Sequence, residues 1–291
     1  MQHFIAIVIS GLNDGCIYAL MALGIVLLQN ATGVINFAQG DLMTLGAFLG
    51  FWWVVQHHGN QIVMYFLTIV FLFGAGVVLE RIGYAPLRRR PPLTILISTF
   101  ALGLGIRAAL EVWQGTQPVN LPSPFGLRTV KVFGAAVSEQ AVLTIGVTVV
   151  VGLALFVFFQ RSSVGRQVRA LAADRETAIL QGIRVRRLSP IIFGLSASLA
   201  GLAGVLIAPQ TGGITTTLGY GLLLNAFAAV ILGGERLGGV VFAALFVAVA
   251  QQLATAYLWP GYQNAYPFLI LVIVLIFRPQ GLVKMVSGVR Y

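Results

Sequence analysis

The chain has 291 residues, of which 58% are hydrophobic and only 9% are charged. An ordinary soluble domain carries about 25% charged residues, and a soluble protein could not cover this much apolar surface with polar groups. The composition therefore indicates a polytopic membrane protein and excludes a soluble enzyme, a nucleic-acid-binding domain and a disordered tail. The net charge of +10 is better explained by cation-rich loops on one side of a membrane than by a nucleic-acid partner.

Long apolar stretches recur along the chain. A bilayer core about 30 Å thick takes about 20 helical residues to cross. Stretches that reach or approach this length lie at 4–28, 44–55, 62–79, 93–113, 140–159, 189–208, 218–232, 238–258 and 265–277. They lack the alternation of barrel strands, so they predict an all-α transmembrane helical bundle of about eight or nine spans. The second, seventh and ninth are short, and we expect them to be tilted, broken or re-entrant. We expect a single domain over residues 1–291 and no strong internal repeat.

Most of the basic residues fall in three loops, at 81–90, 161–187 and 278–290. Counting the crossings between them places all three loops on the same side of the membrane. The positive-inside rule identifies that side as the cytoplasm. The stretch 114–139 has few charges and several prolines, and it is expected to face outward. The side of the N-terminus depends on whether 44–55 crosses.

The largest basic loop, about 161–189, is rich in helix-forming residues. Its apolar residues fall on one side at helical spacing, and Gly182 lies where a glycine would end the helix. We therefore expect one short amphipathic helix over 165–182 on the inner face of the membrane. Two interpretations remain open from the spacing: the helix floats on anionic headgroups, or it docks into a partner.

Four motifs in this order resemble branched-chain amino acid ABC importer permeases, specifically their LivH-type subunit. The segments 15–24 (GCIYALMALG) and 33–41 (GVINFAQGD) together are similar to one N-terminal motif of that family. The glycines at 233–239 and the RPQGL segment at 278–282 are similar to two later ones. The fourth similarity is the cytoplasmic coupling loop, whose matching residues are Gly165, Arg166, Arg169, Ala170, Ala178 and Gly182.

The resemblance implies a transport permease subunit in the bacterial inner membrane, not an enzyme. It would move branched-chain or related small amino acids by alternating access. The implied partners are two ABC ATPase subunits, which bind ATP and Mg²⁺, a second permease (LivM-type or a second copy) and an extracytoplasmic substrate-binding protein. The residues independently support separate ATPases. A phosphate-binding G-x-x-x-x-G-K-[ST] loop needs a lysine after glycine, and neither Lys131 nor Lys284 follows one. No cofactor is expected in this chain.

Polar residues inside the spans are costly in lipid and usually face a cavity or another helix. Asn13, Tyr18, Asn36, Gln39 and Asn225 are therefore candidates for the translocation pathway or its gating. For Asn13 a position near the membrane surface is equally compatible. Asn36 and Gln39 could lie in an ordinary interfacial loop, although the resemblance favours a packing or gating role. Asn225 is expected to hydrogen-bond between helices.

The charged residues near the spans are expected to be structural. Arg107 and Glu111 are four positions apart, a spacing suited to an intrahelical ion pair. Asp14 is expected to lie near the surface, where it could snorkel or cap. The three histidines, which lie outside the apolar runs, form no metal-binding motif, so we expect no metal site.

Other functions remain open. A related permease for urea, short amides, sugars or another small solute would share these motifs. An ion-coupled secondary transporter would usually carry embedded carboxylates, and only Asp14, Asp41 and Glu111 come near. A non-transporting membrane scaffold would not need the cytoplasmic helix.

Overall fold

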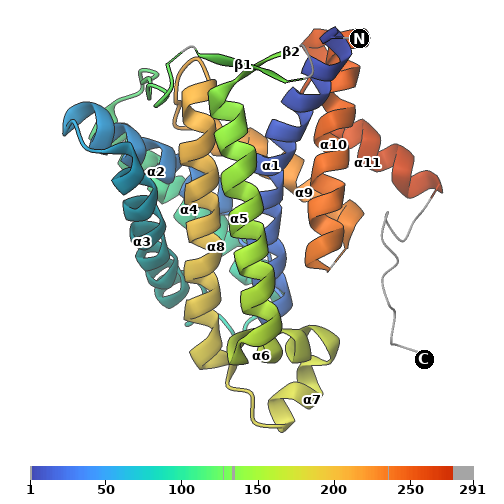
Figure 1. The fold of residues 1–291 in the computed structure, drawn as a ribbon. Helices are drawn as coiled ribbons and strands as arrows, with labels where there is room; N and C mark the ends of the chain where they lie inside the picture. Colours follow the sequence, from blue (N-terminus) through green and yellow to red (C-terminus); the bar gives the residue numbers. More distant parts are fainter. Residues whose placement is uncertain (1, 127, 133–134, 235, 278–291) are drawn as a thin grey trace.

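The computed structural model describes every residue except 1, 127, 133–134, 235 and 278–291. The described residues form an α-helical bundle with one small β-hairpin (Figure 1). The basic residues after 277 and the 278–282 motif lie outside the described residues. The elements are α1 (Gln2–Thr32), α2 (Gln39–Phe51), α3 (Gln61–Leu79), α4 (Pro92–Gln114), β1 (Thr129–Val132), β2 (Ala135–Ser138), α5 (Glu139–Arg161), α6 (Ser163–Ala173), α7 (Arg175–Leu180), α8 (Val185–Ile207), α9 (Leu218–Gly233), α10 (Leu237–Tyr257) and α11 (Tyr266–Phe277).

Six helices of the described chain are long and apolar enough to cross a membrane: α1, α3, α4, α5, α8 and α10. The predicted all-α polytopic bundle is confirmed. The three stretches predicted to be short correspond to the short helices α2, α9 and α11. The hairpin of β1 and β2 was not predicted, because four-residue strands in a turn-rich stretch leave little pattern to detect.

The two ends of the bundle differ. The hairpin and the beginning of α1 lie at one end, which we call the hairpin end (Figure 1). Helices α6 and α7 lie at the other end, here called the arginine-rich end. Helices α1 and α8 form the buried centre, whereas α3, α4 and α5 expose large apolar side chains such as Phe66, Val112 and Val150. Such side chains suit contact with lipid tails.

Two helices begin inside the bundle rather than at one of its ends. After α1 the non-helical residues 33–38 lead the chain back inward, and α2 begins at Gln39. After α8, residues 211–217 do the same from the hairpin end, and α9 begins at Leu218. The two beginnings meet, because the Gly219 N–H donates a hydrogen bond to Thr44 Oγ1 at 3.0 Å. A Cβ on Gly40 would lie 2.8 Å from the Gly219 carbonyl oxygen, so glycine is required at this crossing.

The segments around these two breaks match each other in sequence at one constant offset. Helix α1 runs from the hairpin end toward the arginine-rich end, and α8 runs the opposite way (Figure 1). The matched residues thus lie on segments of opposite direction, which is the arrangement of an inverted repeat. The match is easily missed because its identities are spread thinly along two apolar helices. The clearest corresponding pairs are Thr32 with Thr211, Gly33 with Gly212, Ile35 with Ile214, Gly40 with Gly219, Ala47 with Ala226 and Phe48 with Phe227.

Candidate functional site

The loop at the arginine-rich end contains two short helices, so the prediction of a single helix over 165–182 is wrong. The break is at Asp174, whose backbone is extended (φ −156°, ψ 105°). Its carboxylate accepts a hydrogen bond from the Thr177 N–H at 3.1 Å and thereby caps the start of α7. The Thr177 hydroxyl also donates to this carboxylate, at 2.5 Å, and this bond and the backbone bond lower the pKa of Asp174 below its usual value. Gly182, with φ +91°, follows the end of α7 as predicted.

The arginines of α6 hold that helix against the end of α5. Arg169 donates to the Phe159 carbonyl and, at 3.5 Å, to the Gln160 carbonyl. Arg166 donates to the Arg161 carbonyl at 3.1 Å. These carbonyls end α5, where cations are favourable because the helix terminus carries partial negative charge. The side chains therefore position α6.

Close packing also fixes α6. Gly165 lies against the backbone of Phe159, and the space leaves no room for a Cβ atom. Ala170, on the same helix, is half-buried. The close contact between the end of α5 and the start of α6 thus depends on a glycine at position 165, which explains its place in the motif.

Helix α7 presents apolar side chains outward. Its base is fixed because Arg175 donates to the Ala31 carbonyl at 3.2 Å and Ala178 is buried. Ile179 and Leu180, in contrast, are 48% and 86% exposed. These two side chains form an apolar tip beyond the spanning helices. Leu180 was not identified from the sequence because it lies outside the apolar stripe of the single helix that we expected.

One polar network crosses the bundle at Tyr18. Its hydroxyl donates to Gln251 Oε1 at 2.9 Å and accepts from Asn225 Nδ2 at 2.9 Å, joining α1, α10 and α9. The interhelical hydrogen bond expected for Asn225 is confirmed. All three side chains are buried, so in this conformation they connect helices.

A second network lies nearer the hairpin end. Asn13 donates to Gln210 Oε1 at 2.7 Å. The neighbouring Asp14 accepts from Gln252 Nε2 at 2.5 Å and from Asn13 at 3.2 Å. The expectation that Asp14 snorkels or caps at the surface is therefore wrong. Its carboxylate bonds to Gln252 of α10 and to the neighbouring Asn13 of α1.

The break between α1 and α2 is held by buried amides. The Gln39 side chain donates to the Ser196 carbonyl at 3.0 Å and accepts from the Ser196 hydroxyl at 3.0 Å, which joins α2 to α8. Asn36 Oδ1 accepts from the Ala38 N–H at 3.0 Å and closes the turn before α2. Asn36 thus satisfies a backbone N–H of the non-helical segment, whereas Gln39 fixes the start of α2 to a residue inside α8.

An ion pair that the sequence did not predict joins α2 to α4. Arg107 donates from Nε and Nη2 to Asp41 Oδ1, at 3.1 and 2.9 Å. The Arg107 guanidinium also lies 5.7 Å from the centre of the Tyr220 ring. Glu111 instead accepts from the Thr216 hydroxyl at 3.1 Å. The expected pair of Arg107 with Glu111 is therefore wrong, because Asp41 offers the arginine a carboxylate from another helix.

This ion pair is partly open to the outside of the chain. The side chains of Arg107 and Asp41 are 20% and 9% exposed, and Tyr220 is 44% exposed. Both charged residues lie within apolar helices, where contact of a charge with lipid tails is costly. We call Asp41, Arg107 and Tyr220 the polar face. Its exposure indicates that another protein or a watery passage covers it.

Comparisons with known proteins agree with this architecture. The family described as "Branched-chain amino acid transport system / permease component" matches residues 7–277. The high-affinity branched-chain amino acid transport system permease protein LivH of Escherichia coli K12 is 31% identical over 96% of this chain and 95% of its own length. The corresponding protein BraD of Pseudomonas aeruginosa is 29% identical over 97% and 96%. The solved structure "PsaBC from Streptococcus pneumoniae in complex with Fab" is similar in fold, with a TM-score of 0.50, 14% identity and coverage of 93% and 91%.

Proposed function

Because the chain belongs to the family of branched-chain amino acid transport permeases, we propose that it is the membrane subunit through which an ABC importer moves branched-chain or related small amino acids. The observation that carries this proposal is the apolar tip of α7. It projects at the arginine-rich end on two short helices that are anchored to α5 and α1. Such a projection can receive mechanical work from a partner and pass it to spanning helices.

The energy for transport would come from two ABC ATPase subunits, which bind ATP and Mg²⁺. The arginine-rich end would face the cytoplasm of a bacterial inner membrane, as the positive-inside rule indicates. Ile179 and Leu180 would insert into the ATPases. The residues that position this contact are those of the coupling motif: Gly165, Arg166, Arg169, Ala170, Ala178 and Gly182.

The solute would pass along the polar face. A second permease, of the LivM type or a second copy of this chain, would cover Asp41, Arg107 and Tyr220 and enclose the path. A zwitterionic amino acid offers a carboxylate and an ammonium group, and the ion pair carries the complementary charges. A substrate-binding protein would deliver the solute at the hairpin end.

Tyr18 and the buried amides would then act as gating residues. Tyr18 and Asn225 join α1, α9 and α10, while Asn13 and Gln39 join α1 and α2 to the region around α8. Together with Asn36 they hold α2 and α9 beside the polar face. We call these two helices, which begin inside the bundle, the half-helices. Movement between inward-open and outward-open forms would require these hydrogen bonds to exchange partners.

Affinity purification of the tagged full-length chain from its native membranes tests the proposal. Co-eluting ATPases and ATP-dependent uptake of leucine by vesicles containing the complex are expected. Competition by urea, short amides and sugars measures the solute class, and leucine analogues should compete best. Uptake that follows an ion gradient and persists after ATP depletion would contradict an ABC permease.

A further inference from the structure

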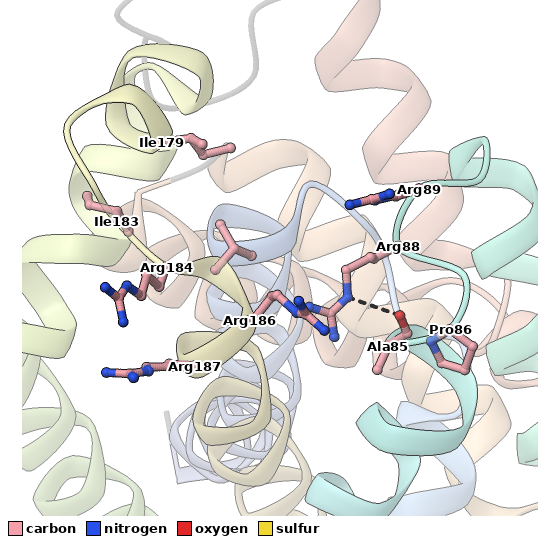
Figure 2. A pocket seen from close by; sticks show the side chains of 10 residues that line it. Ala85, Pro86, Arg88, Arg89, Ile179, Ile183, Arg184, Arg186 and Arg187 are labelled. Atoms are coloured by element: carbon pink, nitrogen blue, oxygen red, sulfur yellow. Dashed lines mark hydrogen bonds between the residues drawn. The ribbon is translucent and has the colours of Figure 1, made fainter.

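A cavity of about 790 Å³ opens at the arginine-rich end, between the turn that follows α3 and the start of α8 (Figure 2). Five arginines line it from two sides. The residues from the turn are Arg88 and Arg89, and those from the start of α8 are Arg184, Arg186 and Arg187. Ile179 and Ile183 add apolar surface at one side.

The positive charge of this cavity is largely uncompensated. Among the described residues, the only carboxylate paired with a lining arginine is Glu80, which lies 3.6 Å from Arg88 and is itself buried. No ion pair within the described chain involves Arg89, Arg184, Arg186 or Arg187. In addition, Arg88 Nη1 is buried without a hydrogen-bond partner in the described chain. An anion entering the cavity would therefore gain charge-assisted hydrogen bonds.

The cavity lies at the depth of lipid headgroups. The span before the turn ends at Tyr84, and the span after it begins at Pro92. The span that contains α8 begins at Val185. All five arginines are thus a few residues from the end of a span. The headgroup layer is about 5–8 Å thick on each side of the hydrocarbon core. Phospholipid phosphates consequently lie where the guanidinium groups are.

We propose that this cavity binds the headgroup of an anionic phospholipid. The phosphate diester would accept hydrogen bonds from arginines on both sides, since the planar guanidinium fits two phosphate oxygens at once. Ile183 would contact the glycerol and the first acyl carbons, while Ile179 stays available to the ATPases. Basic cavities between spans on the cytoplasmic side are known to suit such lipids. The bound lipid would connect the turn after α3 to the link between α7 and α8, and so hold α7 against the bundle.

Native mass spectrometry of the purified full chain in detergent tests this site, with phosphatidylglycerol and phosphatidylcholine as probes. The wild-type chain should retain phosphatidylglycerol in preference to phosphatidylcholine. Each basic residue near an anionic headgroup contributes roughly a fivefold gain in affinity, so R184Q/R187Q should bind phosphatidylglycerol about 30-fold more weakly. The matched control is R90Q/R161Q, which removes two exposed arginines outside the cavity and should change binding less than threefold.

Four results would overturn the proposal. Equal binding of both lipids, or equal weakening in the two paired variants, would show only a diffuse positive surface. Displacement of the lipid by millimolar glycerol phosphate would identify a site for free anions. Loss of co-purifying protein from R184Q/R187Q with unchanged lipid binding would identify an acidic protein segment as the occupant. R184K/R187K keeps both positive charges and serves as the control for misfolding. Its affinity for phosphatidylglycerol should lie between those of the wild type and R184Q/R187Q.

Discussion

The ion pair between Asp41 and Arg107 makes a measurable prediction. R107Q leaves the Asp41 carboxylate without its partner, and D41N leaves the Arg107 guanidinium without its partner. Removal of one member of a buried pair typically costs 3–5 kcal/mol. The lower figure of about 3 kcal/mol applies here, because the Asp41 side chain is 9% exposed and the Arg107 side chain is 20% exposed. The double variant D41N/R107Q leaves no unpaired charge, so it should be no less stable than either single variant. The coupling energy should be about 3 kcal/mol.

Thermal unfolding of the two single variants and the double variant in detergent, monitored by size-exclusion chromatography, measures this coupling energy. Each single variant should lose roughly 6–12 °C in apparent Tm. Glu111 supplies the matched control, since it lies four residues from Arg107 on the same helix but bonds to Thr216. E111Q should be additive with R107Q. Additive losses in D41N/R107Q, or coupling of R107Q to E111Q instead, would refute the geometry described for the polar face.

Four further changes test the coupling loop and the half-helices. L180D should reduce co-purification of ATPases at least tenfold by placing a charge on the apolar tip. L258D, on an exposed leucine that follows α10, should leave it unchanged. R169E should abolish uptake with membrane insertion intact, because it removes the cap from α5, and R169K should restore part of the uptake. Because the pKa of Asp174 is lowered, its cap on α7 is present at neutral pH and is lost as the pH falls through that pKa. Amide hydrogen exchange in α7 should increase over that pH range. D174N should remove this pH dependence. G219A should prevent the two half-helices from meeting and lower the yield of folded protein, and a wild-type yield would argue against that contact.

The spans could be predicted because hydrophobic length is a local property of the sequence. The three short stretches were also recognisable as short, and Gly182 marked the end of α7 because a left-handed residue there favours glycine. The hydrogen bond of Asn225 followed from the cost of an amide in lipid. Each of these conclusions needs only neighbouring residues.

The remaining features depend on residues that are far apart in the chain. Asp41 and Arg107 are separated by 66 positions, and the nearer Glu111 was the more obvious partner. Asp174 lies within the stretch expected to form one helix, but its side chain bonds to the backbone ahead of it and begins a new helix instead. The capping of α5 by Arg169 depends on how α6 folds back, which spacing alone does not reveal.

The inverted repeat has a consequence for how this molecule could work. Residues 33–38 interrupt the chain near one membrane face, and residues 211–217 interrupt it near the opposite face. If each copy adopted the shape that the other has now, the result would be the same molecule turned upside down, with its two breaks exchanged between the membrane faces. A single ancestral unit, duplicated and inserted in the opposite sense, is enough to supply both end states of a pump.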